Sequence, residues 1–188
     1  TVPAPYGITY AHSVATLSGD LDLSMSNELE EVMLQNSTSL QSITLDPSLT
    51  GMTMFHVYNT GITGSTTFEN VLDNNPNLNA YQVALNRIYN GVVSTWTRDF
   101  TNSDIKTNMF YFFINRCCVV GDVTFTDTKT NMREMKLGDT LRVNAASNLH
   151  PTVNISGLTE TRKMNLAGCS IDDLELPKLR DILIELCG

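Results

Sequence analysis

Apolar and polar residues alternate along several short stretches of the chain, with the period of two that is typical of half-buried strands. Residues 8–24 alternate imperfectly and break at Gly19-Asp20, so they predict one or two short strands. Residues 109–120 contain the most hydrophobic run, which favours a central position in a sheet. The other predicted strands are residues 40–45, 52–58, 96–100, 123–126, 132–137, 140–145 and 152–155.

Apolar residues spaced three and four apart predict three short helices. These helices cover residues 27–35, 66–74 and a segment that begins at Asn77 or Asn79 and ends near Val92. The second helix opens with Thr66 and Glu69, the spacing of a capping box. The third helix has one apolar stripe, formed by Leu78, Tyr81, Leu85, Ile88 and Val92.

Residues 172–187 predict an amphipathic helix at the C-terminal end. Asp172 can cap this helix, Glu175 follows three residues later, and Pro177 suits the first turn. Its apolar face is the candidate surface for binding a protein partner. That face consists of Leu176, Leu179, Ile182, Leu183 and Leu186.

These patterns predict a single α+β domain over residues 1–188. Its core would be a β-rich mixed or antiparallel sheet with two or three short helices and the C-terminal amphipathic helix. Two prolines in residues 1–7 predict an extended N-terminal arm. Composition and charge change near residues 101–106, so a domain boundary there is an alternative, and no convincing internal repeat is visible.

The composition is polar but weakly charged. Only 17% of the residues are charged, whereas Thr and Asn are frequent throughout the chain. This profile is familiar in assembled coats, fibres and adhesins. The net charge of −8 lies entirely before Arg87, because the acidic residues of that half have no Lys or Arg among them. The first half is therefore predicted not to bind nucleic acid directly, since it cannot neutralise phosphates.

Candidate chemistry is sparse. His12, His56 and His150 lie too far from one another and from the cysteines to form a local metal site, so no metal, cofactor or catalytic residue is predicted. Cys117 or Cys118 with a histidine is the combination that could serve a cysteine-dependent hydrolase. Buried cysteines are usually inert, and these two follow an apolar run. All four cysteines, the other two being Cys169 and Cys187, are predicted to be thiols in a reducing compartment.

The basic residues after Arg87 are dispersed among equal numbers of acidic ones, which argues against a nucleic-acid patch. Residues 173–183 resemble the first helix of SAP- or LEM-type helical modules, over that one helix only. An ordinary amphipathic terminal helix explains the same spacing more simply. No apolar run is long enough to span a membrane, and the N-terminal residues lack the features of a signal peptide.

The sequence therefore predicts a non-catalytic structural protein that acts through contacts between protein subunits, its own or others. The favoured setting is a virion, as a capsid, phage head or tail component, located in the virion or the host cytoplasm. Two alternatives stay open. One is the cysteine-dependent hydrolase, and the other is a cellular adaptor that binds a partner through the C-terminal helix.

Overall fold

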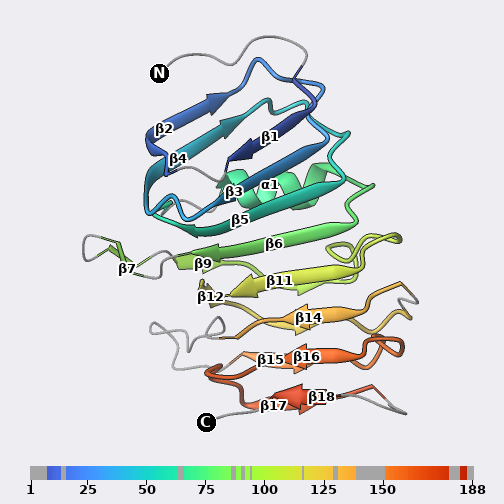
Figure 1. The fold of residues 1–188 in the computed structure, drawn as a ribbon. Coiled ribbons are helices and arrows are strands. Elements are labelled where there is room, and N and C mark those ends of the chain that lie inside the picture. Colours follow the sequence, from blue (N-terminus) through green and yellow to red (C-terminus); the bar gives the residue numbers. More distant parts are fainter. Residues whose placement is uncertain are drawn as a thin grey trace.

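The chain winds as a parallel β-solenoid in the computed structural model (Figure 1). The structure describes residues 8–13, 16–62, 66–85, 88–89, 92–93, 95–115, 117–128, 131–138, 151–177 and 183–185. Its large sheet has eight parallel strands that follow one another in chain order. They are β1 (Tyr10–Ser13), β3 (Glu31–Gln35), β5 (Met54–Thr60), β6 (Ala80–Leu85), β11 (Tyr111–Asn115), β14 (Glu134–Lys136), β16 (Lys163–Asn165) and β18 (Leu183–Glu185).

The second side of the solenoid is made of shorter parallel groups. Strands β2 and β4 pair with each other and run opposite to β1, β3 and β5 in Figure 1. Strands β9 and β12 form another pair, and β10, β13, β15 and β17 form a four-stranded sheet. Their bounds are Ser18–Leu23, Ser39–Leu45, Thr95–Thr97, Cys118–Val120, Phe100–Thr101, Val123–Thr124, Thr152–Asn154 and Asp173–Glu175. Helix α1 (Thr66–Asn74) replaces a strand there, and β7 (Ile88–Tyr89) and β8 (Val92–Val93) form an antiparallel hairpin.

The turns of the solenoid differ in length but share one pattern. The sequence interval between paired strands is longest from Ala80 to Tyr111 and shortest from Lys163 to Leu183. Three buried apolar residues recur with the same spacing at β3, β5, β6, β11 and β14: the second follows the first by three positions, and the third follows the second by two. Examples are Leu29-Val32-Leu34, Met52-Phe55-Val57, Leu78-Tyr81-Val83, Met109-Phe112-Ile114 and Met132-Met135-Leu137, all buried. A small polar residue or cysteine often follows three positions later, as at Ser37, Thr60 and Cys117.

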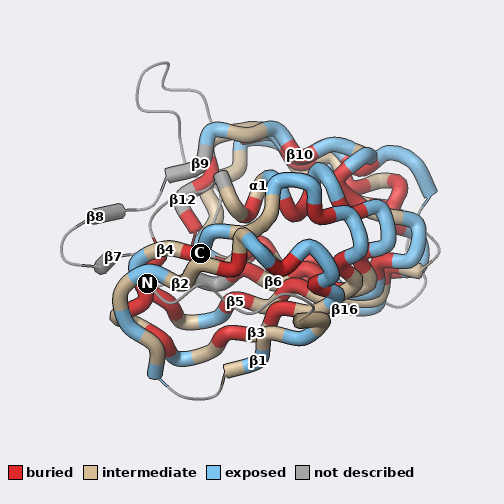
Figure 2. The backbone as a smooth tube through the Cα atoms, turned by 90° about the horizontal axis from the view of Figure 1, so that it is seen from above, coloured by how far each residue is buried: buried red, intermediate tan, exposed pale blue. Residues whose placement is uncertain are grey.

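The core between the two sides is apolar and rich in stacked aromatic rings. Tyr81 stacks on Phe55 and on Phe112, with ring centroids 5.8 and 5.9 Å apart. The Tyr81 hydroxyl donates to the carbonyl of Phe68 at 2.9 Å, which ties α1 to the large sheet. Buried and exposed segments alternate around each turn in Figure 2. These interlocking rings make neighbouring turns depend on one another for stability.

The predicted α+β fold with a mixed or antiparallel sheet is wrong, because every pairing in the large sheet is parallel. The predicted helix over residues 27–35 contains β3, and the one that begins at Asn77 or Asn79 contains β6. Both segments suggest a helix because their apolar residues are spaced three and then two positions apart, as in Leu29, Val32 and Leu34. The first interval matches a helix, but the first residue lies before the strand and only the next two point inward along it.

The predicted C-terminal helix is also wrong. Strands β17 and β18 occupy that segment and pair with β15 and β16 of the preceding turn. Leu176 is half-buried and packs against the core, so it is not on an exposed helix face. Leu183 begins β18, while Leu179, Ile182 and Leu186 lie outside the described residues. The backbone N–H and C=O groups of β17 and β18 find partners in the preceding turn, and this pairing outweighs the local helix propensity of the segment.

Several predictions of single elements agree with the structure. The helix over residues 66–74 is confirmed as α1, and the strands predicted at residues 40–45 and 52–58 correspond to β4 and β5. The arm at residues 1–7 and the strand predicted at 140–145 lie outside the described residues. The single domain over residues 1–188 stays a prediction. In the described part of the chain, no helix has the length and apolar character needed to cross a membrane.

Candidate functional site

The candidate site is the outer face of the eight-stranded sheet, formed by the side chains that alternate with the buried ones. In β3, for example, Val32 and Leu34 are buried, whereas Glu31, Met33 and Gln35 are more exposed. Strand register places the outward residues in rows. The first row is Tyr10, Glu31, Met54, Ala80, Tyr111, Glu134 and Lys163. The second row is His12, Met33, His56, Gln82, Phe113, Lys136 and Asn165.

A further row, here called the entry row, lies just before the strands. Six of its carbonyl groups, from Thr9 to Arg133, each accept two consecutive N–H groups from the next turn. The carbonyl of Phe110, for instance, accepts from Arg133 at 2.9 Å and from Glu134 at 3.2 Å. The entry row consists of Thr9, Glu30, Thr53, Asn79, Phe110, Arg133 and Arg162. This repeated connection keeps all three rows aligned along the solenoid.

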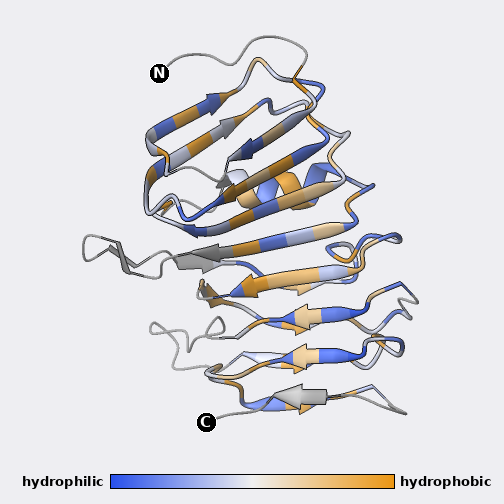
Figure 3. Cartoon of the chain, in the orientation of Figure 1, coloured by the Kyte–Doolittle hydropathy of each residue, from blue (hydrophilic) through white to orange (hydrophobic). Residues whose placement is uncertain are grey.

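Large aromatic side chains are exposed on or beside this face. Tyr10, Tyr58, Phe110 and Tyr111 are 55%, 44%, 42% and 43% exposed, and only Met25 joins them among the large exposed hydrophobic residues that the structure describes. Strand β11 is coloured largely hydrophobic in Figure 3, whereas β14 and β16 carry hydrophilic segments. Phe110 and Tyr111 therefore make the β11 part of the outer face aromatic and open to solvent.

Charge changes sign along the face. At the β1–β3 end, Glu31 lies 3.1 Å from His12, between Oε2 and Nε2, and Glu30 accepts a hydrogen bond from the Tyr10 hydroxyl at 3.3 Å. The negative charge of Glu30 raises the pKa of Tyr10. At the β14–β16 end, the entry row carries Arg133 and Arg162. The face is thus acidic at one end and basic at the other.

Within the basic end, one carboxylate is held between two lysines. Glu134 Oε1 lies 3.0 Å from Lys136 Nζ and 3.2 Å from Lys163 Nζ. Burial raises the pKa of Glu134, but hydrogen bonds from the two lysines outweigh burial and lower it. Lys136 Nζ also lies 4.4 Å from the centroid of the Phe113 ring. These contacts fix the lysines beside the aromatic centre of the face.

His56 lies on the same face, in the second row between Met33 and Gln82. Partial burial lowers the pKa of His56, and the negative charge of Glu31 opposes that effect in part. The imidazole is therefore held in its neutral form at neutral pH. In the part of the chain that the structure describes, no group of His, Cys, Asp and Glu side chains is arranged to hold a metal ion.

The residues considered for thiol chemistry do not come together. Cys117 is fully buried, and its Sγ lies 3.4 Å from the carbonyl oxygen of Asn115 and 3.8 Å from that of Val83. His12 and His56 lie on the outer face, on the other side of the sheet from the core. The backbone of Cys118 begins β12, and His150 and Cys187 lie outside the described residues.

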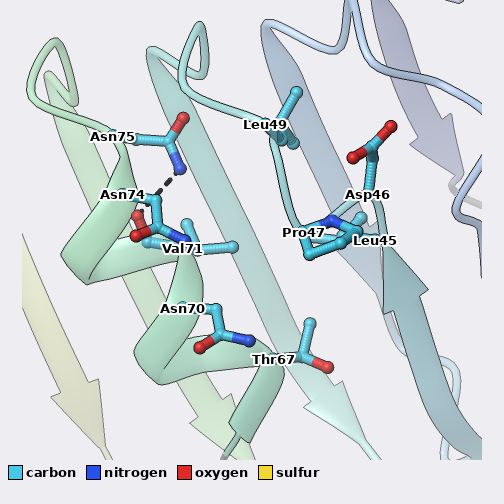
Figure 4. Close-up of a pocket in the computed structure, with 9 residues that line it drawn as sticks. All are labelled: Leu45, Asp46, Pro47, Leu49, Thr67, Asn70, Val71, Asn74 and Asn75. Atoms are coloured by element: carbon cyan, nitrogen blue, oxygen red, sulfur yellow. Dashed lines mark hydrogen bonds between the residues drawn. The ribbon is translucent and has the colours of Figure 1, made fainter.

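A small cavity lies between α1 and the β4–β5 connection (Figure 4). It measures about 50 Å³, and Asn75 closes it by accepting a hydrogen bond from the Met52 N–H at 2.9 Å and donating one to the Val71 carbonyl at 3.0 Å. Sites for organic ligands are usually several hundred Å³. The hydrogen bonds of Asn75 give this cavity a structural explanation.

The outer face could not be located from the sequence, because the predicted sheet had no assigned strand order. The signal that could have located it is the recurring apolar spacing that ends each turn with a small polar residue or cysteine. The interval over which that spacing recurs is longer between Leu78 and Met109 than between Leu29 and Met52. A search for one constant period misses a repeat of such variable length. No family model matches the chain, and no curated protein or solved structure matches it either.

Proposed function

We propose that this protein is a non-catalytic assembly protein that binds another protein through the outer face of its eight-stranded sheet. The observation that carries the proposal is that several aromatic side chains are exposed to solvent on or beside one regular sheet face. Tyr58 and Tyr111 come from β5 and β11, far apart in sequence, and both are more than two-fifths exposed. Exposed aromatic clusters with a charged rim are typical of protein interfaces.

The architecture supports the same proposal. A solenoid buries one side of each strand in its core and leaves the other side in a long, regular surface. The recurring spacing resembles that of leucine-rich repeats, whose strands line one such surface. The outer rows here combine tyrosine, phenylalanine, methionine and arginine, the residue types that are enriched at interfaces. The surface is rigid because each strand is hydrogen-bonded to the next turn.

A virion component is the narrower form of this proposal. Its support is the Thr- and Asn-rich, weakly charged composition, which suits assembled coats. Copurification of the protein with intact particles at a fixed stoichiometry would test that setting directly. The cysteine-dependent hydrolase has weaker support, because Cys117 is buried away from His12 and His56.

Site-specific photocrosslinking tests the proposed surface. A benzophenone amino acid replaces Tyr111 on the outer face, and in a matched control it replaces Met25, which is 39% exposed in the turn after β2. In native extract, we expect position 111 to form a discrete, saturable adduct with one protein species, identified by mass spectrometry. Position 25 should not form that adduct.

A second variant tests whether the adduct depends on the outer face. A Tyr58→Ala substitution should weaken the adduct formed at position 111, since both side chains belong to the same surface. Equal labelling from positions 25 and 111, or an adduct at 111 that Tyr58→Ala leaves unchanged, would contradict the proposal. Crosslinks to the protein's own chain count as support here, because a second copy is one kind of partner.

A further inference from the structure

The outer face is complementary to itself. The large sheet has eight strands in the order β1-β3-β5-β6-β11-β14-β16-β18, so its midpoint lies between β6 and β11. The outward carboxylates Glu30 and Glu31 lie on the β3 side of this midpoint. On the other side, β14, β16 and the residues just before them carry four basic side chains and one outward carboxylate, Glu134. The apolar centre, with Phe110 and Tyr111, lies at the midpoint itself.

We propose that the face binds a second copy of this chain, as a symmetric face-to-face dimer. The two-fold axis would run parallel to the strands and pass between β6 and β11. This inference rests on the proposed function and names the partner for the same surface. A rotation about that axis turns one face toward the other and reverses the solenoid direction, while strand direction is kept. The two copies would thus have antiparallel solenoid axes.

The rotation brings together residues of opposite charge. Strand β3 of one copy would lie over β16 of the other, because they are second and seventh in the sheet. Rows are preserved because strand direction is preserved, so Glu30 meets Arg162 in the entry row and Glu31 meets Lys163 in the first row. Symmetry makes each of these contacts twice.

The centre of the same arrangement is apolar. Strand β6 of one copy would lie over β11 of the other, so Ala80 faces Tyr111 across the axis, and Gln82 faces Phe113. Ala80 is small and only 4% exposed, so its own side chain adds little to this contact, and the Tyr111 and Phe113 rings supply most of its apolar surface. Aromatic rings packed at the centre and charged pairs at the ends match the usual anatomy of an interface.

The other face-to-face orientation is disfavoured by charge. A two-fold axis along the solenoid would place β3 of one copy over β3 of the other, and β16 over β16. The strand that carries Glu31 would then lie over its own symmetry mate, as would the strand that carries Lys163. Like charges opposed in an interface cost binding energy. Electrostatics therefore selects the antiparallel arrangement of the two solenoids.

The expected affinity is modest. Eight strands about 4.8 Å apart make a face about 34 Å long, and the outward rows are about 15 Å wide. Two such faces bury about 1,000 Å² in total, at the lower end of specific interfaces. The dimer should therefore form at micromolar concentrations and exchange with monomer.

Charge reversal tests the arrangement. Sedimentation analysis of the full chain at low ionic strength, from about 1 to about 200 μM, should reveal a monomer–dimer equilibrium. Glu30→Lys and Arg162→Glu alone should each raise the dissociation constant by about tenfold or more, because each change creates two like-charge contacts. In the double variant the dissociation constant should return to within about threefold of the wild-type value, because positions 30 and 162 again carry opposite charges, with the signs exchanged.

Asp173→Lys is the matched control, because Asp173 is exposed on β17 in the opposite sheet and should not alter dimerisation. Circular dichroism confirms that each variant is folded. A wild-type protein that stays monomeric at the highest concentration would overturn the second copy as partner. So would a double variant as weak as the single ones. A monomer that still forms a crosslink from position 111 to a different protein would leave the proposed function standing.

Discussion

At the scale of single residues, Arg98 shows how charge stabilises the solenoid turns. Its Nη2 donates to Asp73 of α1 at 2.6 Å and also to Asp104, which is buried. Burial lowers the pKa of Arg98, but the hydrogen bonds and charges of the two aspartates outweigh it and raise the pKa overall. Asp104 also accepts a hydrogen bond from the Thr101 N–H at 2.7 Å. Arg98 and its two aspartates therefore join α1, which carries Asp73, to the turn after β10, which carries Asp104.

Asp104→Ala should destabilise the protein by about 3 kcal/mol, because the mostly buried Arg98 guanidinium keeps only Asp73 as a carboxylate partner and the Thr101 N–H loses its acceptor. Glu160→Ala is the matched control. Glu160 pairs with Arg133 at 4.0 Å on the surface, where the loss should be below about 1 kcal/mol. Urea denaturation measures both free energies of unfolding. Equal losses would show that burial of the Asp104 pair has no special weight.

His56 should make stability depend on pH. Its folded pKa is lowered mainly by burial, so the unfolded chain binds more protons once the pH falls below the unfolded value of about 6.5. The stabilisation is fully present above that value and is lost as the pH falls through the folded pKa. The difference in unfolding free energy between wild type and His56→Gln should therefore shrink or reverse toward acid pH. A difference that is constant between about pH 8 and 5 would contradict this.

Cys117 should react slowly with thiol reagents. The side chain is fully buried, whereas Cys169 is partly exposed. Iodoacetamide at neutral pH should therefore label Cys169 at least about tenfold faster than Cys117 in the folded protein, and denaturation should remove the difference. Peptide mass spectrometry with site assignment measures both rates. Faster labelling at Cys117 would revive the cysteine-dependent hydrolase.

At the scale of elements, alternate residues of one strand have opposite roles. In β11, Phe112 is fully buried and packs against Tyr81, Phe100 and Phe125, with ring centroids between 5.7 and 5.9 Å apart. The next residue, Phe113, points outward and contacts Tyr111 and Lys136. The strand therefore separates the core from the proposed binding surface by one step of the pleat.

Phe112→Ala should cost about 3–5 kcal/mol of unfolding free energy, because it leaves a cavity among the surrounding rings. Phe113→Ala should cost about 1 kcal/mol or less and instead weaken self-association. Denaturant unfolding and sedimentation, applied to both variants, separate the two effects. The register would be wrong if Phe113→Ala were the more destabilising change.

At the scale of the whole molecule, charge is distributed along the solenoid as it is along the sequence. All Asp, Glu, Lys and Arg side chains before Arg87 are acidic, and the strands of the large sheet lie in the same order as in the chain. The charge asymmetry in the sequence becomes a gradient along the outer face. The second half is balanced overall, but Arg133, Arg162 and Lys163 gather on that face.

Self-association should weaken as ionic strength rises, because exposed charge pairs are screened while the apolar centre is not. The Debye length falls from about 10 Å at 0.1 M salt to about 3 Å at 1 M. We expect the dissociation constant to rise several-fold over this range in sedimentation experiments. In the double variant Glu30→Lys with Arg162→Glu the salt dependence should persist. Association that strengthens with salt would point to an interface held by apolar contacts alone.

The local pattern by itself determined much of this protein. Alternation located β4 and β5, the capping box located α1, and the sparse charge and missing ligand spacings argued for binding over catalysis. Only the tertiary structure decided that β6 and β17 are strands. Their apolar residues satisfy a helical spacing equally well, and the backbone partners that favour a strand belong to neighbouring turns, far away in the sequence. The outer face follows from the same pairing, since residues such as Glu31 and Lys163 share a row through hydrogen bonds between turns, which no local pattern contains.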